Sequence, residues 1–208
     1  MTETSAKYGE KADRWSELQY ADPARYLNRR AELIVSLGPR LQPGELVLDL
    51  ACGDGGQAEY LLPLGLRYLG VDANEQMVAA AERRLSGRAE VVLADLNEFV
   101  PPQPVAATTC FRAIYYARER RSLFAQLASF TERKLVFDLN PRQYSPAEIR
   151  ADLEATGWRH FAMRPFFIPQ NAALPAPLVA LARLAERSGP LARLILRLRF
   201  SYLCAAWR

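Results

Sequence analysis

Acidic residues and a glycine cluster occupy the positions of this chain that are best suited to chemistry. Asp49 lies in the apolar run 46–50, which predicts a buried strand, and glycines fill three of the four positions 53–56. Glycine has no Cβ and tolerates positive φ, so the backbone of such a cluster can come within contact distance of a ligand. A helix predicted just beyond it would offer free N–H groups and the positive end of its dipole.

A second acid follows the next predicted strand. Strand 68–71 leads into Asp72, 19 residues after Gly53. A carboxylate at this place can accept hydrogen bonds from both hydroxyls of a ribose. Together these features predict a site for a small molecule that contains a nucleoside. Two plainer interpretations stay open: the glycines could form an ordinary strand–helix turn, and Asp72 could cap a helix that begins at Glu75.

The glycine cluster alone does not decide which nucleoside binds, because residues 53–58 also fit the dinucleotide fingerprint G-x-G-x-x-G/A. Three features favour S-adenosylmethionine over NAD. Asp49 would attract the cationic amino group of a methionine moiety and repel a pyrophosphate. Asp95 and Leu96 follow a third predicted strand, 90–94, and could accept from an adenine amino group and pack on its ring. The chain then ends in an apolar run, 200–207, in place of a second nucleotide-binding half.

These segments resemble the class I S-adenosylmethionine-dependent methyltransferases. The matches are Val-Leu-Asp-Leu-Ala-Cys-Gly-Asp-Gly at 47–55, Tyr-Leu-Gly-Val-Asp at 68–72 and Leu-Ala-Asp-Leu at 93–96, and the resemblance covers roughly residues 24–208. It implies that the loop after the first strand binds the methionine end of the cofactor, Asp72 the ribose, and Asp95 the adenine side. For Asp95, a cap of segment 96–99 remains an alternative. The implied cofactor site comprises Asp49, Ala51, Cys52, Gly53, Gly55, Asp72, Ala73, Met77, Asp95, Leu96 and Phe111.

Ala51 departs from the family pattern, which usually has its first glycine at this place. Alanine in place of this glycine costs little conformational strain if its φ is negative, and the cofactor should still fit.

The elements that must position these residues alternate along the chain. Apolar runs predict strands at 46–50, 68–71, 90–94, 106–111, 134–139 and 158–168, with helices at 56–62, 75–85, 119–130 and 146–156. Alternation of this kind predicts a parallel sheet covered by helices on both faces. The resemblance implies a Rossmann-like three-layer sandwich of α/β class, with a seven-stranded, mostly parallel sheet in the order 3-2-1-4-5-7-6 and an antiparallel last strand.

The length predicts a single domain of 208 residues. We divide it into N-terminal cap helices (1–40), a cofactor-binding core (41–168), a helical insertion (169–199) and the last strand (200–208).

Charge and composition exclude several classes. The net charge is +4, and segment 168–208, with six arginines and one glutamate, carries +5, so the remainder carries −1. No basic stripe accompanies the three motifs, so no nucleic acid is expected. Three widely spaced cysteines and the single histidine, His160, fit reduced thiols and no metal centre. Without a signal core or a long apolar run, we expect a cytoplasmic protein with no membrane span.

The methyl acceptor should lie beyond the carboxyl ends of the strands. The weak candidates for catalysis there are Tyr115, Tyr116 and Arg142, while Arg112 or Arg142 could hold an anionic acceptor. A loop tyrosine more often packs than reacts. His160 lies in the sixth strand and is expected to be structural or at the surface. In the cap, Trp15, Tyr20 and Tyr26 could line the acceptor site or pack in the core.

The insertion carries leucines at helical spacing with arginines four apart. We favour amphipathic helices that pack on the sheet edge with solvated arginines. A cap or dimer surface, or a peripheral membrane contact through 175–199, stays open.

The leading hypothesis for the whole chain is methyl transfer to a small molecule, in one interpretation a hydrophobic one. The alternatives are a non-catalytic cofactor-binding partner subunit and, less favoured, an NAD-dependent oxidoreductase.

Overall fold

A central sheet of seven strands organises the molecule. The computed structural model describes residues 12–196 and 201–208. Within them the strands are β1 (Leu46–Leu50), β2 (Arg67–Asp72), β3 (Glu90–Leu93), β4 (Val105–Cys110), β5 (Thr131–Leu139), β6 (His160–Phe166) and β7 (Ser201–Trp207). Residues 1–11 of the predicted cap, 197–199 of the predicted insertion and Phe200 of the predicted last strand lie outside the described residues.

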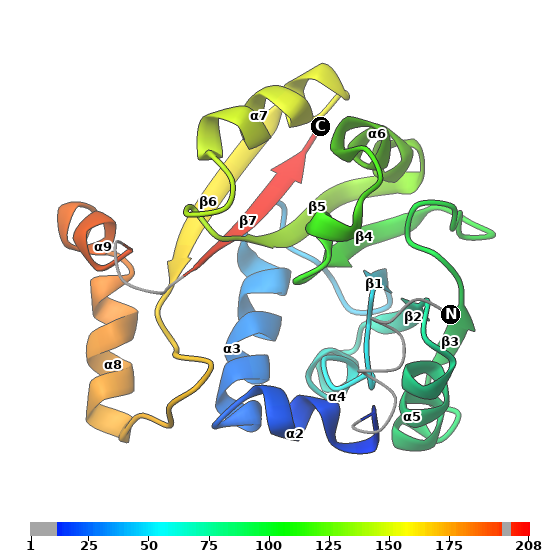
Figure 1. The fold of residues 1–208 in the computed structure, drawn as a ribbon, viewed down its shortest axis with the longest axis horizontal. Coiled ribbons are helices and arrows are strands. Elements are labelled where there is room, and N and C mark those ends of the chain that lie inside the picture. Colours follow the sequence, from blue (N-terminus) through cyan, green and yellow to red (C-terminus); the bar gives the residue numbers. More distant parts are fainter. Residues whose placement is uncertain (1–11, 197–200) are drawn as a thin grey trace.

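The strands follow the order β3-β2-β1-β4-β5-β7-β6 (Figure 1). β1 pairs in parallel with both β2 and β4, whereas β7 pairs antiparallel with β5 and β6. This order and the antiparallel last strand confirm the predicted Rossmann-like fold. Because the strand order reverses between β1 and β4, a crevice is expected at the carboxyl ends of these strands.

Helices cover both faces of the sheet (Figure 1). They are η1 (Ala12–Arg14), α2 (Trp15–Gln19), α3 (Pro23–Ser36), α4 (Ala58–Leu61), η2 (Leu62–Leu64), α5 (Glu75–Leu85), η3 (Ile114–Tyr116), α6 (Arg120–Phe130), α7 (Pro146–Ala155), α8 (Ala176–Ala185) and α9 (Pro190–Ile195). The start of α3 has a clear local cause: Pro23 occupies the first turn and the side chain of Asp22 accepts from the backbone N–H of Arg25.

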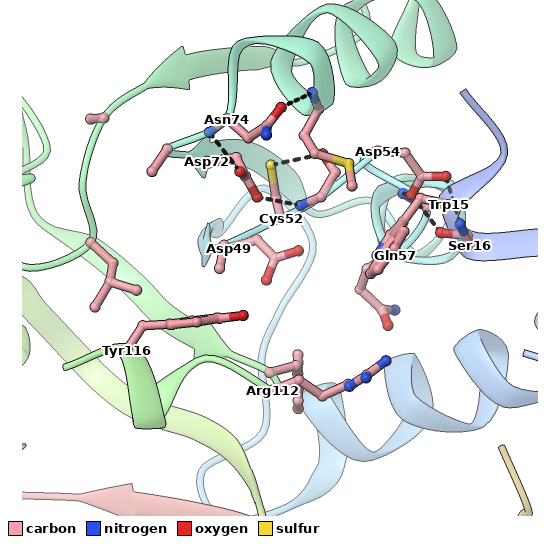
Figure 2. Close-up of a pocket in the computed structure, with 18 of the residues that line it drawn as sticks. Trp15, Ser16, Asp49, Cys52, Asp54, Gln57, Asp72, Asn74, Arg112 and Tyr116 are labelled. Atoms are coloured by element: carbon pink, nitrogen blue, oxygen red, sulfur yellow. Dashed lines mark hydrogen bonds between the residues drawn. The ribbon is translucent and has the colours of Figure 1, made fainter. Parts of the chain in front are cut away.

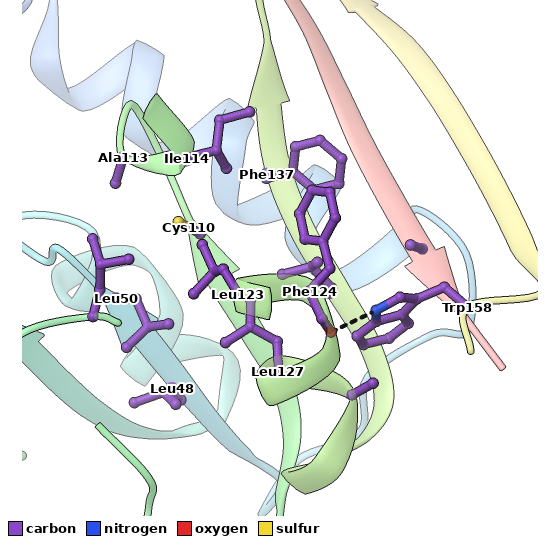
Figure 3. Close-up of a cluster of buried hydrophobic side chains, with 14 of the residues drawn as sticks. Leu48, Leu50, Cys110, Ala113, Ile114, Leu123, Phe124, Leu127, Phe137 and Trp158 are labelled. Carbon is purple, nitrogen blue, oxygen red and sulfur yellow. Dashed lines mark hydrogen bonds between the residues drawn. The ribbon is translucent and has the colours of Figure 1, made fainter. Parts of the chain in front are cut away.

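The alternation of side chains along β1 divides the core into two layers. Leu48 and Leu50 are fully buried on the face covered by α6 and α7, where they join Leu123, Phe124 and Phe137 (Figure 3). Val47 points to the other face and joins a cluster with residues of α3 and α4. Asp49 has the same parity as Val47, so β1 aims its carboxylate toward the α3 side of the sheet.

Two local expectations differ from the structure. The sixth strand was expected from 158, but it begins at His160, because Trp158 is buried against α6 and its indole Nε1 donates to the carbonyl of Phe124 at 3.1 Å (Figure 3). The fifth strand begins at Thr131, three residues earlier than expected, because the chain passes from α6 into β5 without a loop.

The helical insertion is present as α8 and α9, but its leucines do not pack on the sheet as expected. Leu181 and Leu184 are 59% and 66% exposed, and of the residues of α8 only Val179 is buried. The favoured interpretation of the insertion is therefore wrong for these leucines. Across the described parts of the chain, no helix has the length and apolar character that crossing a bilayer would require.

A buried lysine links the sheet to α3. The ammonium of Lys134 in β5 donates to the carbonyls of Val35 at 3.0 Å and Leu37 at 2.8 Å, at the end of the helix. Burial lowers the pKa of Lys134 to about 7, and repulsion from Arg133 acts in the same direction. Since the unfolded chain then binds this proton more tightly than the folded chain, stability should rise with pH above the folded pKa.

We expect the free energy of unfolding to rise by about 1 kcal/mol between pH 7 and pH 8, as one buried proton is lost. The variant Lys134→Met should lack this rise in urea titrations. The window ends near pH 8 because burial raises the pKa of the thiols of Cys110 and Cys204, which reverses the trend at higher pH. An equal slope in the two proteins would contradict the assignment.

Candidate functional site

A cavity of about 410 Å³ opens at the carboxyl ends of β1, β2 and β4. This volume lies within the range of small-molecule sites, about 300–1,000 Å³. The cavity is lined by Trp15, Ser16, Tyr20, Arg30, Asp49, Ala51, Cys52, Gly53, Asp54, Gly56, Gln57, Asp72, Ala73, Asn74, Met77, Ala94, Asp95, Leu96, Asn97, Phe111, Arg112, Tyr115 and Tyr116 (Figure 2). It thus brings together every residue of the predicted cofactor site except Gly55.

Gly55 packs behind the cavity. Its φ is +70°, and a Cβ there would lie 3.2 Å from the Cβ of Ala81 in α5. The glycine therefore lets the loop pack against this helix, and it does not line the cavity. Gly53, with φ +57°, does line the cavity, and a Cβ there would meet the indole of Trp15 at 3.2 Å.

The carboxylate of Asp72 holds two turns in place. Its Oδ2 accepts from the backbone N–H of Gly53 at 2.9 Å, and its Oδ1 accepts from that of Asn74 at 3.0 Å (Figure 2). Burial raises the pKa of Asp72, and these hydrogen bonds oppose the rise. Asp72 is not the cap of the following helix, since the side chain of Asn74 caps α5 by accepting from the N–H groups of Gln76 and Met77.

Asp49 is buried at the floor of the cavity. Thr109 donates its hydroxyl to Oδ1 at 2.6 Å and Tyr68 donates to Oδ2 at 2.8 Å. Burial raises the pKa of Asp49 above its ordinary value, although both hydroxyls and the nearby Arg30 lower it. A carboxylate in this environment would be stabilised in its charged form by a cationic ligand.

Asp95 lies at the outer end of the cavity in a different environment. Its Oδ1 accepts from the backbone N–H of Asn97 at 2.8 Å and its Oδ2 pairs with Arg118 at 3.0 Å. Burial raises the pKa of Asp95, but the bonds from Asn97 and the guanidinium of Arg118 outweigh it and leave the pKa below its ordinary value. Asp95 therefore stabilises its own turn, as its alternative interpretation as a cap predicted. It also lines the cavity.

The loop after β4 forms the opposite wall. Tyr115 and Tyr116 lie with ring centroids 4.4 Å apart, and both are partly exposed at the cavity. Arg112 has a φ of +52°; its backbone N–H donates to Asp138 at 2.6 Å, and its guanidinium donates to Gln19 at 2.7 Å. Such a left-handed conformation is uncommon outside glycine and is found at functional sites.

Other candidates lie elsewhere. Arg142, a candidate for catalysis, is exposed after β5 and is not part of the cavity lining. His160 is exposed on β6 and stacks on Trp207, so it is a surface histidine as expected. Of the cap aromatics, Trp15 and Tyr20 line the cavity, whereas Tyr26 packs between Tyr20 and Phe166. Among the described residues, no group of three or more His, Cys, Asp or Glu side chains could hold a metal ion.

Comparison with known proteins agrees with this geometry. The family model of a methyltransferase domain matches residues 47–134, which include all four acids that line the cavity. Residues 47–134 of this chain therefore form a methyltransferase domain. The resemblance inferred from the motifs is thereby confirmed. No curated protein is similar to this chain in sequence.

Solved structures share the fold of this methyltransferase domain at low sequence identity. A magnesium protoporphyrin IX methyltransferase from Synechocystis, with bound S-adenosylmethionine, is 18% identical with a TM-score of 0.61, over 97% of this chain and 84% of that one. A TehB-like methyltransferase from Corynebacterium glutamicum is 16% identical with a TM-score of 0.65, over 99% and 98%. A phosphoethanolamine N-methyltransferase from Haemonchus contortus is 16% identical with a TM-score of 0.61, over 86% and 52%.

Arg30 of α3 was not among the predicted site residues. Its side chain is only 7% exposed, lines the cavity and lies with its guanidinium carbon 4.4 Å from the ring centre of Phe111. It donates to two neutral groups, Oε1 of Gln57 at 2.5 Å and the hydroxyl of Tyr20 at 3.3 Å. A signal was present: Arg30 lies three residues after Leu27 and four before Ile34, on the apolar face of α3.

Ser16 and Asp54 were also missed, and they fasten the cap to the cofactor loop. The backbone N–H of Ser16 donates to Asp54 Oδ2 at 2.9 Å, and the guanidinium of Arg84 donates to the same oxygen at 2.8 Å. These contacts hold α2 over the cavity, so Trp15 forms part of its wall.

Ala51 was expected to cost little in place of glycine if its φ were negative, but its φ is positive. Its φ is +58°, in the left-handed region that disfavours residues with a Cβ. The strain of a non-glycine residue there is about 1–2 kcal/mol, against about 0.5–1 kcal/mol for the extra flexibility of glycine in the unfolded chain.

We therefore expect Ala51→Gly to raise the free energy of unfolding by about 0.5–1 kcal/mol in urea titrations. The matched control is Ala79→Gly in the middle of α5, which should lower it by about 1 kcal/mol. If both substitutions destabilise the protein equally, Ala51 is not strained.

Proposed function

We propose that this methyltransferase transfers the methyl group of S-adenosylmethionine to a small acceptor with an apolar body and an anionic substituent, held beside Tyr115 and Tyr116. The observation that carries the proposal is one cavity lined both by acids at the ends of three neighbouring strands and by the aromatic loop after β4. Reactions on an open α/β sheet take place beyond these strand ends.

The methionine end of the cofactor carries both an ammonium and a carboxylate. Asp49 and Arg30 line the floor of the cavity and interact electrostatically with each other. We assign the ammonium to Asp49, whose buried carboxylate gains a cationic partner, and the carboxylate to Arg30, whose hydrogen-bond partners are neutral. Buried charges are costly unless paired, so both assignments lower the free energy of the bound state.

The rest of the cofactor extends toward β3. Asp72 has its carboxylate fixed by two backbone N–H groups and is placed to accept from the ribose hydroxyls. Asp95, Leu96 and Asn97 form the end of the cavity that we assign to the adenine. Because the neighbouring turns hold Asp72 rigidly, little entropy is lost when it binds the ribose.

When bound, S-adenosylmethionine supplies a methyl group already activated by the positive sulfur. The task of the protein is then to align the acceptor atom with the methyl–sulfur bond, and well-oriented reactants account for about 7–11 kcal/mol of a barrier. Among the described residues, the wall formed by 111–116 offers two phenols and a guanidinium. We infer that the phenols orient the acceptor and that water is excluded by the cap residues Trp15 and Tyr20.

The nature of the acceptor follows from this wall. The structural neighbours act on acceptors as different as magnesium protoporphyrin IX and phosphoethanolamine, so the shared fold does not select one. In this chain the rings of Phe111, Tyr115 and Tyr116 favour an apolar acceptor body. The guanidinium of Arg112 donates to the neutral Gln19 and also interacts electrostatically with Asp138, and its remaining N–H groups suit an anionic substituent.

Calorimetry tests the cofactor site. We expect saturable binding of S-adenosylmethionine and S-adenosylhomocysteine and none of NAD. Arg30→Gln and Asp72→Asn should each weaken binding about 10–100-fold, because each removes one charge-assisted contact of about 1.5–3 kcal/mol. Arg67→Gln, at an exposed arginine of β2, is the matched control and should bind normally. Normal affinity in folded Arg30→Gln would refute its assignment, and binding of NAD in place of S-adenosylmethionine would refute the site.

Transfer to the acceptor is tested with methyl-labelled S-adenosylmethionine and the small-molecule fraction of a cell extract. The label should enter an anionic, organic-soluble product. Arg112→Gln should lower the yield at limiting extract more than at excess extract, because it weakens acceptor binding. Label that enters only protein, or only cationic products, would contradict the proposed acceptor class.

A further inference from the structure

Two helices of the insertion carry an exposed apolar surface, which we call the leucine face. Its leucines are 47–66% exposed: Leu178, Leu181 and Leu184 of α8, and Leu191 and Leu194 of α9. Single exposed leucines are ordinary on a protein surface. Five on two consecutive helices are unusual, and exposed apolar surface concentrated in one part of a protein marks interaction sites.

The same helices are basic. Neither α8 nor α9 contains an acidic residue, while Arg183 lies in the last turn of α8 and Arg187 follows it. The single acid of segment 169–208, Glu186, is buried and does not offset this charge. Its carboxylate is bound by Arg29 at 2.7 Å and by the backbone N–H of Phe167 at 3.1 Å. Arg183 pairs with Glu32 of α3 at 3.6 Å, so the exposed positive charge that α8 brings beside the leucine face comes from Arg187.

Exposed leucines together with positive charge favour one kind of binding partner for this face over another. A second copy of the chain docking through the same face would bring arginines against arginines, which is unfavourable. Leucines on one side of a helix with arginines beside them fit the boundary of an anionic lipid bilayer, where the leucines enter the acyl region and the arginines meet phosphate groups.

The leucine face is joined to the catalytic cavity through α3. Arg29 binds Glu186 at the end of α8, and the next residue, Arg30, lines the cavity. The backbone N–H of Ala21 also donates to the carbonyl of Gln170 at 2.8 Å, which ties the chain leading into α8 to the cap. Figure 1 shows α8 standing beside α3 with α9 at its end, at the side of the molecule away from β3.

We propose that α8 and α9 dock this protein on the surface of an anionic membrane through the leucine face. The docking is peripheral and does not depend on the assignment of the acceptor. It places α3 and the cap near the lipid boundary, where apolar molecules with an anionic group concentrate.

Vesicle co-sedimentation tests this docking with the whole chain and no methyl acceptor. We expect binding to vesicles of equal parts phosphatidylglycerol and phosphatidylcholine at about 0.05 M salt, and loss of binding at about 1 M salt, where charges are screened within about 3 Å. Vesicles of phosphatidylcholine alone should bind at least about fivefold less.

Variants locate the contact. Leu181→Asp and Leu184→Asp should each reduce binding to the anionic vesicles about fivefold or more, and Arg187→Glu should do the same. Leu64→Asp changes a similarly exposed leucine of η2, 46% exposed, and should bind normally. Circular dichroism and S-adenosylhomocysteine binding confirm that each variant is folded.

Three outcomes would overturn the proposal. They are no binding of the unaltered protein to anionic vesicles, equal binding by Leu181→Asp, and concentration-dependent self-association that Leu181→Asp abolishes without any lipid binding. The last would assign the leucine face to a second copy of the chain.

Discussion

The carboxylate of Asp72 joins two turns that would otherwise be independent. One of its oxygens holds the N–H of Gly53 and the other holds that of Asn74. The cofactor loop after β1 is thereby fixed to the start of α5, at the end of β2. Since glycine loops have many accessible conformations, an anchor of this kind is what makes a preformed cavity possible. The assigned ribose contact uses a carboxylate that the fold has already oriented.

Two opposite charges, on Asp49 and Arg30, lie at the floor of the cavity. Asp49 is the one acid on the α3-facing side of a strand whose neighbours are apolar, and burial raises its pKa. Arg30 reaches the same region from α3 and is bound by neutral groups. Two opposite charges held near each other without direct pairing suit a zwitterionic ligand better than a pyrophosphate. The methyltransferase family match and this pair of charges therefore lead to the same cofactor.

Much of this arrangement could be predicted from the sequence. Apolar runs that end in an acid or a glycine predict the strands. Since the carboxyl ends of parallel strands meet at one edge of the sheet, the acids that follow these strands are predicted to lie together. Two features could not be predicted. The φ of Ala51 depends on how tightly the loop turns, and the choice of Asn74 over Asp72 as the cap of α5 depends on where the helix begins. The position of Arg30 on the apolar face of α3 indicated that it is buried, but which cavity it lines depends on the packing of α3 on the sheet. Periodicity likewise predicted the helices of the insertion but not that their leucines would remain exposed.

A crystal structure with S-adenosylhomocysteine tests the central claim most directly. The account predicts the ribose hydroxyls on the carboxylate of Asp72, the ammonium on Asp49 and the carboxylate on Arg30, with the sulfur facing Tyr115 and Tyr116. A ligand whose amino-acid end lies at Asp95, or one bound outside this cavity, would contradict it.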